Sequence, residues 1–396
     1  MTPDEQPRSL PERYVFLCLR VDPHIEGFVD AYIGPPEWRD LVSAEQPVRP
    51  EALRGEALAL SEALPSEGLE PERERWLSAQ LKALECVTAS LAGETVAWAD
   101  EVESCLGIRP TRTDTAVFEE AHRRLDAALA GNGTVRDRYI AWDERNAIPA
   151  EKILPALERL KDVLAPRAHE LAPMPAEESV TYETVTDKPW IAYNWYQGRF
   201  HSRVDVNVEL PISIALLTDL TAHEAYPGHH TESAAKEAHL IDRLGRVETS
   251  IAIISAPEAL VSEGIAMNAL EQALGPHPYE VVLDELRGLG VTFDPAEVRE
   301  VHQAEHALFA TATNAAFMLH EDGAPTEQAE AYLREWGLES DEKAARTVAF
   351  LTAPTSRAYI SAYTDGRRLC RAFAERDPGN FTRLLTEQLT TADLLE

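Results

Sequence analysis

Apolar positions in the first part of the chain recur at intervals of three and four residues, the period of an amphipathic helix. The pattern is clearest in residues 51–68, 71–92, 114–133 and 149–165. Several of these segments begin at Asp or Pro and end at Gly, the residues that favour helix starts and stops. The pattern predicts a helical N-terminal lobe over residues 1–170.

A proline-rich stretch at residues 165–178 interrupts this rhythm and predicts a boundary. Apolar and polar side chains then alternate from residue 203 to residue 210, which predicts a half-buried strand. Pro211 starts a predicted helix, and helical patterns continue to the end of the chain. We therefore expect a mainly α fold, a large helical body in which residues 171–396 form a second lobe with a small β-sheet beside the helix that carries His223.

Composition and charge narrow the class of protein. The 396 residues are 44% apolar, enough for a large core. Lys and Arg number 37 against 68 Asp and Glu, and the net charge of −31 repels phosphate backbones and anionic lipid surfaces. We expect no nucleic-acid partner and no membrane partner. The sequence does not indicate which oligomeric state the protein adopts.

The chain also lacks the signals of export. No apolar run approaches the roughly 18 residues that a membrane span needs. The N-terminal residues lack the basic and apolar regions of a signal peptide, so we expect a cytoplasmic protein. The cysteines are far apart, with no Cys-x-x-Cys pair, and predict neither a zinc knuckle nor a disulfide framework. They are Cys18, Cys86, Cys105 and Cys370.

Candidate chemistry concentrates in the stretch HEAYPGHH, which begins at His223. A zinc-hydrolase helix normally reads His-Glu-x-x-His, with both histidines on one face. His223 and His229 are too far apart for that, since about 600° of rotation separates them in an unbroken helix. Pro227 must bend or open the helix, and Gly228 permits a positive φ at the break. We expect this break to bring His229 or His230 beside His223.

Two glutamates strengthen the case for a metal site. Glu224 follows the first histidine, where a zinc hydrolase needs a carboxylate to take a proton from water. Such a site also needs a third protein ligand that leaves one position open. Glu263 lies in the apolar segment LVSEGIAMNALE, where an acidic residue needs a partner, and it is our candidate ligand. For the histidines alone, a polar helix end without metal is the alternative.

Four stretches, TAHEAYPGHHTE, SEGIAMNALE, MLHEDGAPTEQA and APTSRAYISAYTDGRRL, resemble an uncharacterised bacterial family, a domain of unknown function. Its signature is His-Glu-x-x-Pro-Gly-His followed by Glu-Gly-aromatic, and VDAYIGPPEW fits one branch of it. The resemblance covers nearly the whole chain. The family is similar to zinc metallopeptidases with two histidines and a downstream glutamate. The resemblance implies a hydrolase that binds one zinc ion, and the substrates of the family are mostly unassigned.

The resemblance also implies roles for individual residues. The zinc ligands would be His223, His229 and Glu263. Glu224 would be the general base. His320 and Tyr363 match further family positions, and either could donate a hydrogen bond to the anion that forms at the substrate carbonyl.

Three positions depart from the family pattern. Ile265 stands where an aromatic residue is usual, and Ala312 and Ala316 stand where an arginine and an aspartate are expected. These departures concern the substrate pocket more than the metal. They leave open a metal-binding helical protein without turnover.

Substrate contacts are predicted from charge and from the strand. Arg203, Arg357 and Arg367 are candidate partners for a substrate carboxylate, with surface ion pairs as the alternative. His230 is a further candidate for substrate contact. The strand at residues 202–210 would hold an extended peptide by backbone pairing if it lies at a sheet edge. We expect a peptidase or small amide hydrolase that acts on short peptides and prefers cleavage at chain ends.

A second motif, HQAEH at residues 302–306, has the reversed order of another zinc-peptidase class. His302, Glu305 and His306 share one face of a predicted helix. That helix is rich in Glu and Ala, which usually form a solvated face. Three alternatives therefore remain: zinc at His223, zinc at His302, or a helical scaffold without metal.

Overall fold

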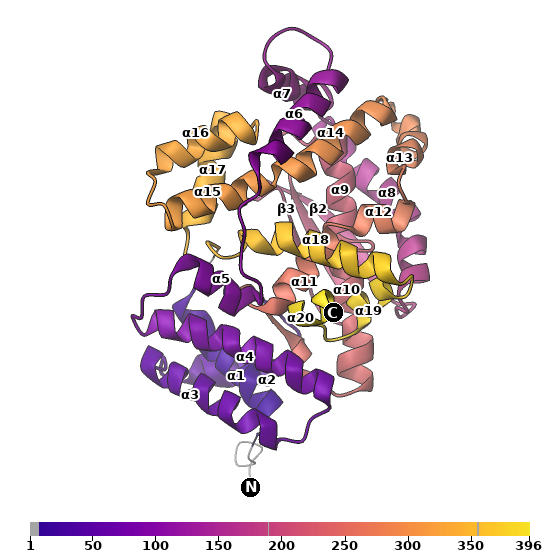
Figure 1. Ribbon diagram of the computed structural model, residues 1–396. Helices are drawn as coiled ribbons and strands as arrows, with labels where there is room; N and C mark the ends of the chain where they lie inside the picture. The colour runs from indigo at the N-terminus through magenta and orange to yellow at the C-terminus, as the bar shows by residue number, and fades with distance from the viewer. Residues whose placement is uncertain (1–7, 189, 355) are drawn as a thin grey trace.

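The computed structural model describes residues 8–188, 190–354 and 356–396. Helices dominate the described chain, and its strands form one two-stranded and one three-stranded sheet (Figure 1). The predicted mainly α fold with a small sheet is confirmed. The first seven residues of the predicted N-terminal lobe lie outside the described residues.

The N-terminal elements lie together at the lower end of the molecule in Figure 1. They are α1 (Leu10–Val21), β1 (Val29–Tyr32), α2 (Pro36–Ala44), α3 (Pro50–Ala63), α4 (Pro71–Leu91) and α5 (Trp98–Leu106). The chain then crosses to the upper end through α6 (Thr115–Ala128), α7 (Val135–Arg145) and α8 (Ala150–Leu171). The four predicted helical segments correspond to α3, α4, α6 and α8, which confirms them.

The elements that carry the predicted site follow. They are β2 (Ser179–Val185), β3 (Ala192–Tyr196), β4 (His201–Asn207), α9 (Ile214–Glu224), α10 (His229–Lys236), a π-helical segment (Glu237–Arg243), β5 (Ile251–Ile253) and α11 (Pro257–Ala266). The remaining helices are α12 (Ala269–Leu274), α13 (Pro278–Leu286), α14 (Pro295–Leu308), α15 (Ala310–His320), α16 (Thr326–Trp336), α17 (Asp341–Thr352), α18 (Ile360–Arg376), α19 (Asn380–Thr386) and α20 (Thr391–Leu395).

The predicted strand is β4, but its setting differs from the prediction. β4 is the central strand of the order β2-β4-β3, parallel to β2 and antiparallel to β3. Asp205 and Asn207 are only 5% and 1% exposed, so the strand is not half-buried. Trp195 and Arg203 donate hydrogen bonds to the Asp205 carboxylate, which permits its burial. β4 is also no edge strand, and a peptide cannot pair with it.

The predicted helix start at Pro211 is wrong by three residues. The carbonyl of Ile212 accepts a hydrogen bond from the Ile148 N–H, in the segment after α7, at 2.8 Å, so it does not join the hydrogen bonds of the helix. Ser213 then caps the helix by accepting from the Leu216 N–H at 3.4 Å. A serine cap satisfies a backbone donor that proline could not.

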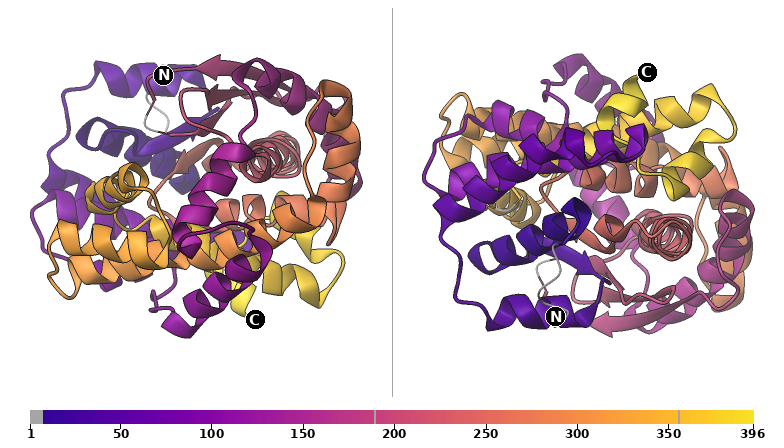
Figure 2. Two further views of the ribbon diagram at one scale, coloured as in Figure 1. Left: turned by 90° about the horizontal axis from the view of Figure 1, so that it is seen from above. Right: turned by 90° about the horizontal axis from the view of Figure 1, so that it is seen from below.

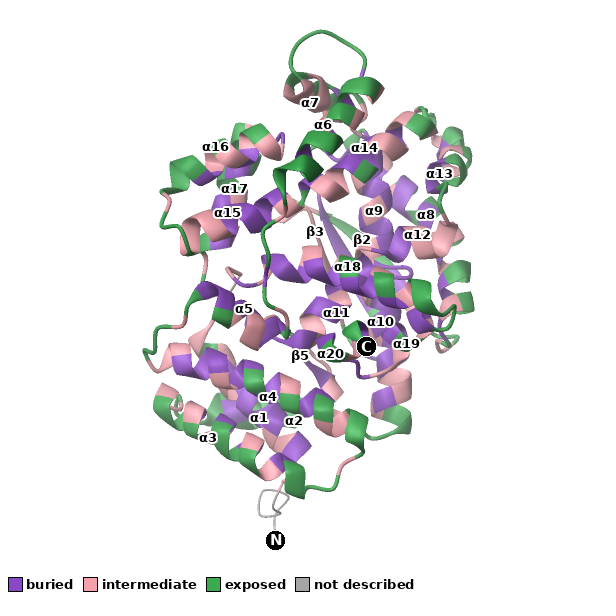
Figure 3. Ribbon diagram, viewed as in Figure 1, coloured by how far each residue is buried: buried purple, intermediate pink, exposed green. Residues whose placement is uncertain are grey.

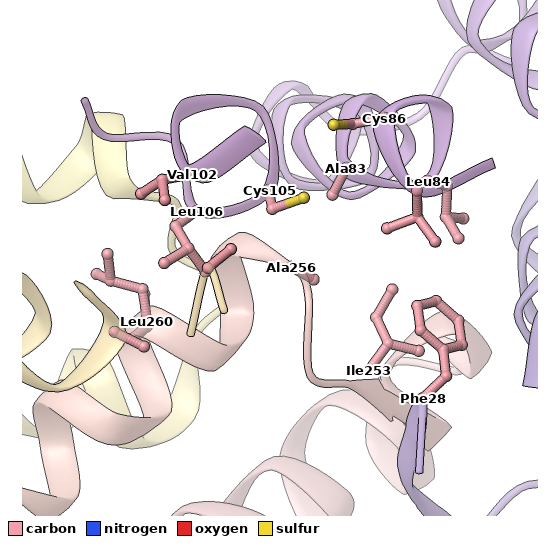
Figure 4. Close-up of a cluster of buried hydrophobic side chains, with 14 of the residues drawn as sticks. Phe28, Ala83, Leu84, Cys86, Val102, Cys105, Leu106, Ile253, Ala256 and Leu260 are labelled. Carbon is pink, nitrogen blue, oxygen red and sulfur yellow. The ribbon is translucent and has the colours of Figure 1, made fainter. Parts of the chain in front are cut away.

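Two hydrophobic cores hold the helices together. In the first, side chains of α4, α5, β5 and α11 face one another: Leu84 and Ile253 lie near Phe28, and Leu106 lies nearer Leu260 (Figure 4). In the second, α6, α8, α9 and α14 pack with the three-stranded sheet through Phe118, Leu157, Leu217, Val301 and Val204. Each core uses residues from both sides of residue 170, and the division into two lobes stays a prediction.

The arrangement of the cores places the site. α11 belongs to the first core and α9 to the second, so their polar residues meet between the two. Buried residues are concentrated in these central helices, whereas α3, α6 and α7 present exposed faces (Figure 3). The C-terminal helices lie beside the N-terminal ones (Figure 2), where Thr391 donates a hydrogen bond to the Leu106 carbonyl at 2.6 Å. No helix in the described ranges is long and apolar enough to cross a membrane.

Candidate metal centre

The helix break predicted within HEAYPGHH is present. α9 ends at Glu224, α10 begins at His229, and the Tyr226–Pro227 bond between them is cis. Gly228 has φ −80°, so the expected positive φ is wrong. Glycine is required for another reason: a Cβ at Gly228 would lie 1.9 Å from the carbonyl oxygen of His223. The chain can fold back this tightly only without a side chain there.

The break brings two histidines and a glutamate together. The rings of His223 and His229 lie 4.7 Å apart and nearly perpendicular. Nε2 of His223 is 3.4 Å from Oε2 of Glu263, and Nε2 of His229 is 3.8 Å from Oε1. All three side chains offer a ligand atom within 4.8 Å of the others. This is the donor set of a zinc site with three protein ligands and one open position.

The Glu263 carboxylate fits a metal ligand. Its Oε1 accepts a hydrogen bond from the Tyr359 hydroxyl at 2.6 Å, while its buried Oε2 has no hydrogen-bond partner among the described residues. Burial would raise the pKa of Glu263, but His223 and His229 hold it below its usual value. Burial would likewise lower the pKa of His223, but Glu263 raises it to about 9. An ionised carboxylate with a free buried oxygen suits a bound cation.

A chain of contacts behind His229 fixes its ring. Nδ1 of His229 lies 3.0 Å from Oγ of Ser262, which in turn donates to Oε2 of Glu232 at 2.6 Å. Lys236 donates to the other oxygen of Glu232 at 2.7 Å. Such partners orient a histidine ligand and set which nitrogen faces the metal. The sequence prediction missed Ser262 and Glu232, although each lies within three residues of a predicted ligand.

A cavity of about 470 Å³ opens on this cluster. Glu224 lines it beside both histidines, and burial raises the pKa of the Glu224 carboxyl. Asp30 and Tyr193 line it as well, and the Tyr193 hydroxyl donates a hydrogen bond to Asp30. No role was predicted for Asp30, although it lies in the stretch VDAYIGPPEW that marked the resemblance.

Tyr363 also lines the cavity, next to Tyr359. Their rings lie 5.4 Å apart, edge to face. Burial raises the pKa of Tyr363 well above its ordinary value, so its hydroxyl stays protonated and can donate. Its hydroxyl makes no hydrogen bond to the rest of the described chain, whereas that of Tyr359 is engaged by Glu263. Tyr363 therefore lies in the wall of the cavity that also holds His223 and His229.

Two predicted histidines are not brought to the cavity. Nε2 of His320 lies 2.7 Å from the Leu351 carbonyl oxygen, and its ring stacks on Trp98, so it is part of the helix packing. His230 is fully buried between Ser202 and Glu178, at 2.9 and 2.7 Å. Burial lowers the pKa of His230, so it is neutral. Neither side chain lines the cavity.

The three predicted arginines also lie elsewhere. Arg203 pairs with Asp205 at 2.9 Å on the sheet, and Arg357 pairs with Glu101 of α5. Arg367 lies on α18 outside the cavity lining. None of the three arginines lines the cavity, and their predicted contact with a substrate carboxylate stays a prediction. Ile265, Ala312 and Ala316 are buried in the first core and do not line the cavity either.

The second motif is only partly assembled as predicted. His302 and His306 are neighbours, with their Nε2 atoms 2.9 Å apart. Glu305 does not join them, because it accepts a hydrogen bond from the Tyr139 hydroxyl at 2.6 Å. Asp219 of α9 takes its place, with Oδ1 3.3 Å from Nε2 of His302.

Known proteins share the fold. Neither a protein-family model nor a curated protein matches the chain. A solved "putative lipoprotein" from Colwellia psychrerythraea has a TM-score of 0.55 at 16% identity, over 87% of this chain and 68% of its own. Another putative lipoprotein "of unknown function", from Shewanella oneidensis, has a TM-score of 0.53 at 12% identity, over 98% of this chain and 82% of its own. An M32 carboxypeptidase from Deinococcus radiodurans R1 has a TM-score of 0.40 at 12% identity, over 95% of this chain and 88% of its own.

At these identities the likeness concerns the fold alone. The class of this protein is defined by a mainly helical body that contains a cavity, whose wall carries two histidines and a glutamate able to hold a metal ion.

Proposed function

We propose that the protein is a metal-dependent hydrolase, a peptidase that acts on short peptides with one zinc ion in the cavity. A single observation carries the proposal: His223, His229 and Glu263 converge on one point, and Glu224 lines the same cavity. A zinc hydrolase requires three protein ligands for the metal and an adjacent carboxylate that acts as general base.

The residues of the chain have distinct tasks in this proposal. A zinc ion would polarise the substrate carbonyl and make water a better nucleophile at neutral pH. The Glu224 carboxylate takes the proton from the attacking water and passes it to the leaving amine. Its raised pKa suits this transfer, because a general base works best when its pKa is near the working pH. Tyr363 donates to the oxygen on which negative charge develops.

Peptide binding is assigned to β3 in place of β4. β3 is one of the two edge strands of its sheet, and it lines the cavity through Ala192, Tyr193, Asn194 and Tyr196. An extended peptide can add to such an edge by backbone hydrogen bonds. A cavity of about 470 Å³ suits a short segment of chain.

The charges in the cavity favour an amine end of the substrate over a carboxylate end. Among the described lining residues, Lys236 is the one lysine or arginine, and it is paired with Glu232 and Glu258. Asp30 is solvent-exposed within the cavity, and Tyr193 engages one of its oxygens. The other oxygen is available to a substrate ammonium group. We assign the preference of an aminopeptidase to this site.

A peptide library read by mass spectrometry tests the function. Zinc-loaded enzyme should release N-terminal residues from free peptides and leave N-acetylated copies intact. Glu224→Gln keeps the shape of the side chain but cannot take a proton, so it should retain zinc and lose turnover by about 10³-fold or more. Identical products from wild type and Glu224→Gln would refute the hydrolase, and internal cuts would refute the preference for chain ends.

We further propose that the enzyme works in the cytoplasm. The four cysteines are buried and free, as thiols are in a reducing compartment. Fractionation of cells that express the chain tests this. Recovery in the membrane fraction, with release only by detergent, would contradict it.

A further inference from the structure

A second cluster of potential metal ligands lies outside the cavity. His302 and His306 are one turn apart on α14 and share a face. Asp219 approaches them from α9, one turn before His223. Their ligand atoms all lie within 4.8 Å of one another, and none of the three residues lines the cavity.

Hydrogen bonding alone does not account for this geometry. A hydrogen-bonded relay through a histidine uses both ring nitrogens, one toward each partner. Here Nε2 of His302 faces both partners, Nε2 of His306 at 2.9 Å and Oδ1 of Asp219 at 3.3 Å. A single proton on that nitrogen can point at only one of them. Three ligand atoms within 4.8 Å of one another can all donate a lone pair to one cation.

The spacing fits a zinc-like ion. Bonds of about 2.0–2.1 Å to nitrogen and oxygen place tetrahedral ligand atoms about 3.3 Å apart. The two distances to Nε2 of His302 lie close to that value. Two histidines four residues apart on a helix, with a carboxylate from another helix, are a common way of building such a site.

We propose that Asp219, His302 and His306 bind a second divalent metal ion, of the zinc class, separate from the ion in the cavity. Its ligands join α9 to α14, and α9 also carries His223 and Glu224. The second ion is therefore structural: it fixes the helix on which the candidate catalytic residues stand. This inference does not depend on hydrolysis.

The protonation states of the three side chains differ. Burial would raise the pKa of Asp219, but His302 lowers it, so the carboxylate is ionised. Burial, together with His302 and Arg367, lowers the pKa of His306 well below its ordinary value. Burial would also lower the pKa of His302, but Asp219 raises it. A histidine ligand is neutral, so a bound ion would displace the proton of His302.

Other groups face the cluster without competing for the ion. Arg367 places a positive charge near both histidines, and Arg371 places another near His306; these charges oppose a cation. The Tyr279 ring packs edge-on against His302, with centroids 5.6 Å apart. Glu305 is held by Tyr139 and is no ligand.

Zinc content is the direct test. The full chain is stripped with a chelator, reloaded with zinc, separated from free metal and analysed by elemental mass spectrometry. Wild type should hold two zinc ions, and one should remain in His302→Ala/His306→Ala. The variant His223→Ala/His229→Ala should also keep one. Glu305→Gln, in the same helix turn, is the matched control and should keep two.

Crystallography keeps the inference testable if the histidine variant fails to fold. Anomalous scattering at the zinc edge from wild-type crystals should give a peak between Asp219, His302 and His306. One zinc ion per wild-type chain, lost in His223→Ala/His229→Ala, with no peak at Asp219, would overturn the second site and leave the first intact. One ion retained in that variant and lost in His302→Ala/His306→Ala would support the second site even if the cavity binds none.

Discussion

Gly264 of α11 and Gly366 of α18 meet where the two helices cross. A Cβ at Gly264 would lie 2.5 Å from the Gly366 carbonyl oxygen, and a Cβ at Gly366 would lie 3.1 Å from the Gly264 nitrogen. The helices therefore pack backbone against backbone, which small residues alone allow. Glu263 adjoins this crossing on one helix, and Tyr363 lies one turn before it on the other. The contact thus sets the distance between a predicted metal ligand and a predicted hydrogen-bond donor.

Gly264→Ala should disturb both stability and the site. The added methyl group meets Sγ of Cys370 at 2.4 Å as well as backbone, so the helices must move apart. We expect a loss of about 1–3 kcal/mol in the free energy of unfolding, measured with denaturant, and weaker zinc binding. Gly55→Ala, where nothing lies within 4 Å, is the control and should be neutral or slightly stabilising. Equal behaviour of the two variants would contradict the argument.

Ser262→Ala should weaken zinc binding although Ser262 is not one of the predicted zinc ligands. The change removes the contact between Nδ1 of His229 and Oγ of Ser262, and it also releases Glu232. Loss of such an orienting partner typically costs 10–100-fold in metal affinity, by order of magnitude. Competition with a chromogenic chelator measures the zinc Kd. Ser233→Ala, on the same cavity wall, should leave the Kd unchanged; a matching loss there would point to a general effect of the wall.

The two cavity tyrosines should separate into different roles. Tyr363→Phe removes a free donor, and we expect kcat to fall on the order of 10²-fold with KM nearly constant. Tyr359→Phe instead removes the 2.6 Å hydrogen bond to Glu263, so zinc affinity should fall first. Steady-state kinetics at saturating zinc, with zinc Kd measured in parallel, distinguishes them. A fall in kcat for Tyr359→Phe alone would reverse the assignment.

Much of this architecture could be predicted from local patterns. Amphipathic periodicity located α3, α4, α6 and α8, because a helix buries one face whatever it packs against. The candidate metal ligands could also be predicted from the sequence, because Pro227 and Gly228 lie between His223 and His229 and force the helix to break there. Local chemistry was enough in both cases.

The errors concern contacts between distant segments. Periodicity placed Glu305 with His302, but a tyrosine from α7 engages Glu305, and Asp219 from another helix replaces it. His320 was matched by its place in a motif, yet a backbone carbonyl 31 residues away holds it. Nothing in the alternation of β4 indicates that strands pair on both sides of it. Sequence spacing does not report which distant group competes for a side chain.

Glu178→Gln should change the acid stability of the fold. Burial would raise the pKa of Glu178, but hydrogen bonds from His230 and Tyr226 lower it to about 2, against 4.5 for an ordinary glutamate. A depressed carboxyl pKa stabilises the folded state above pH 4.5, and this stabilisation is lost as the pH falls toward 2. The shift corresponds to at most about 3 kcal/mol. Denaturant unfolding at several pH values should show that wild type loses more stability between pH 5 and pH 2 than Glu178→Gln; parallel curves would contradict it.

Asp30→Asn tests which end of the substrate enters the cavity. Asparagine still accepts the hydrogen bond from Tyr193, so the wall keeps its shape, but the negative charge is lost. If Asp30 binds the substrate ammonium group, KM for peptides with a free N-terminus should rise about tenfold, the equivalent of about 1.4 kcal/mol, with a smaller effect on kcat.

Peptides with a blocked end are the controls. N-acetylated peptides should be cleaved poorly, and at the same rate, by wild type and by Asp30→Asn. C-terminally amidated peptides should behave like free ones, because the described cavity wall offers no unpaired lysine or arginine to a carboxylate. A strong loss of cleavage on amidation, with no effect of acetylation, would mean that the cavity binds the C-terminus and that Asp30 has another role.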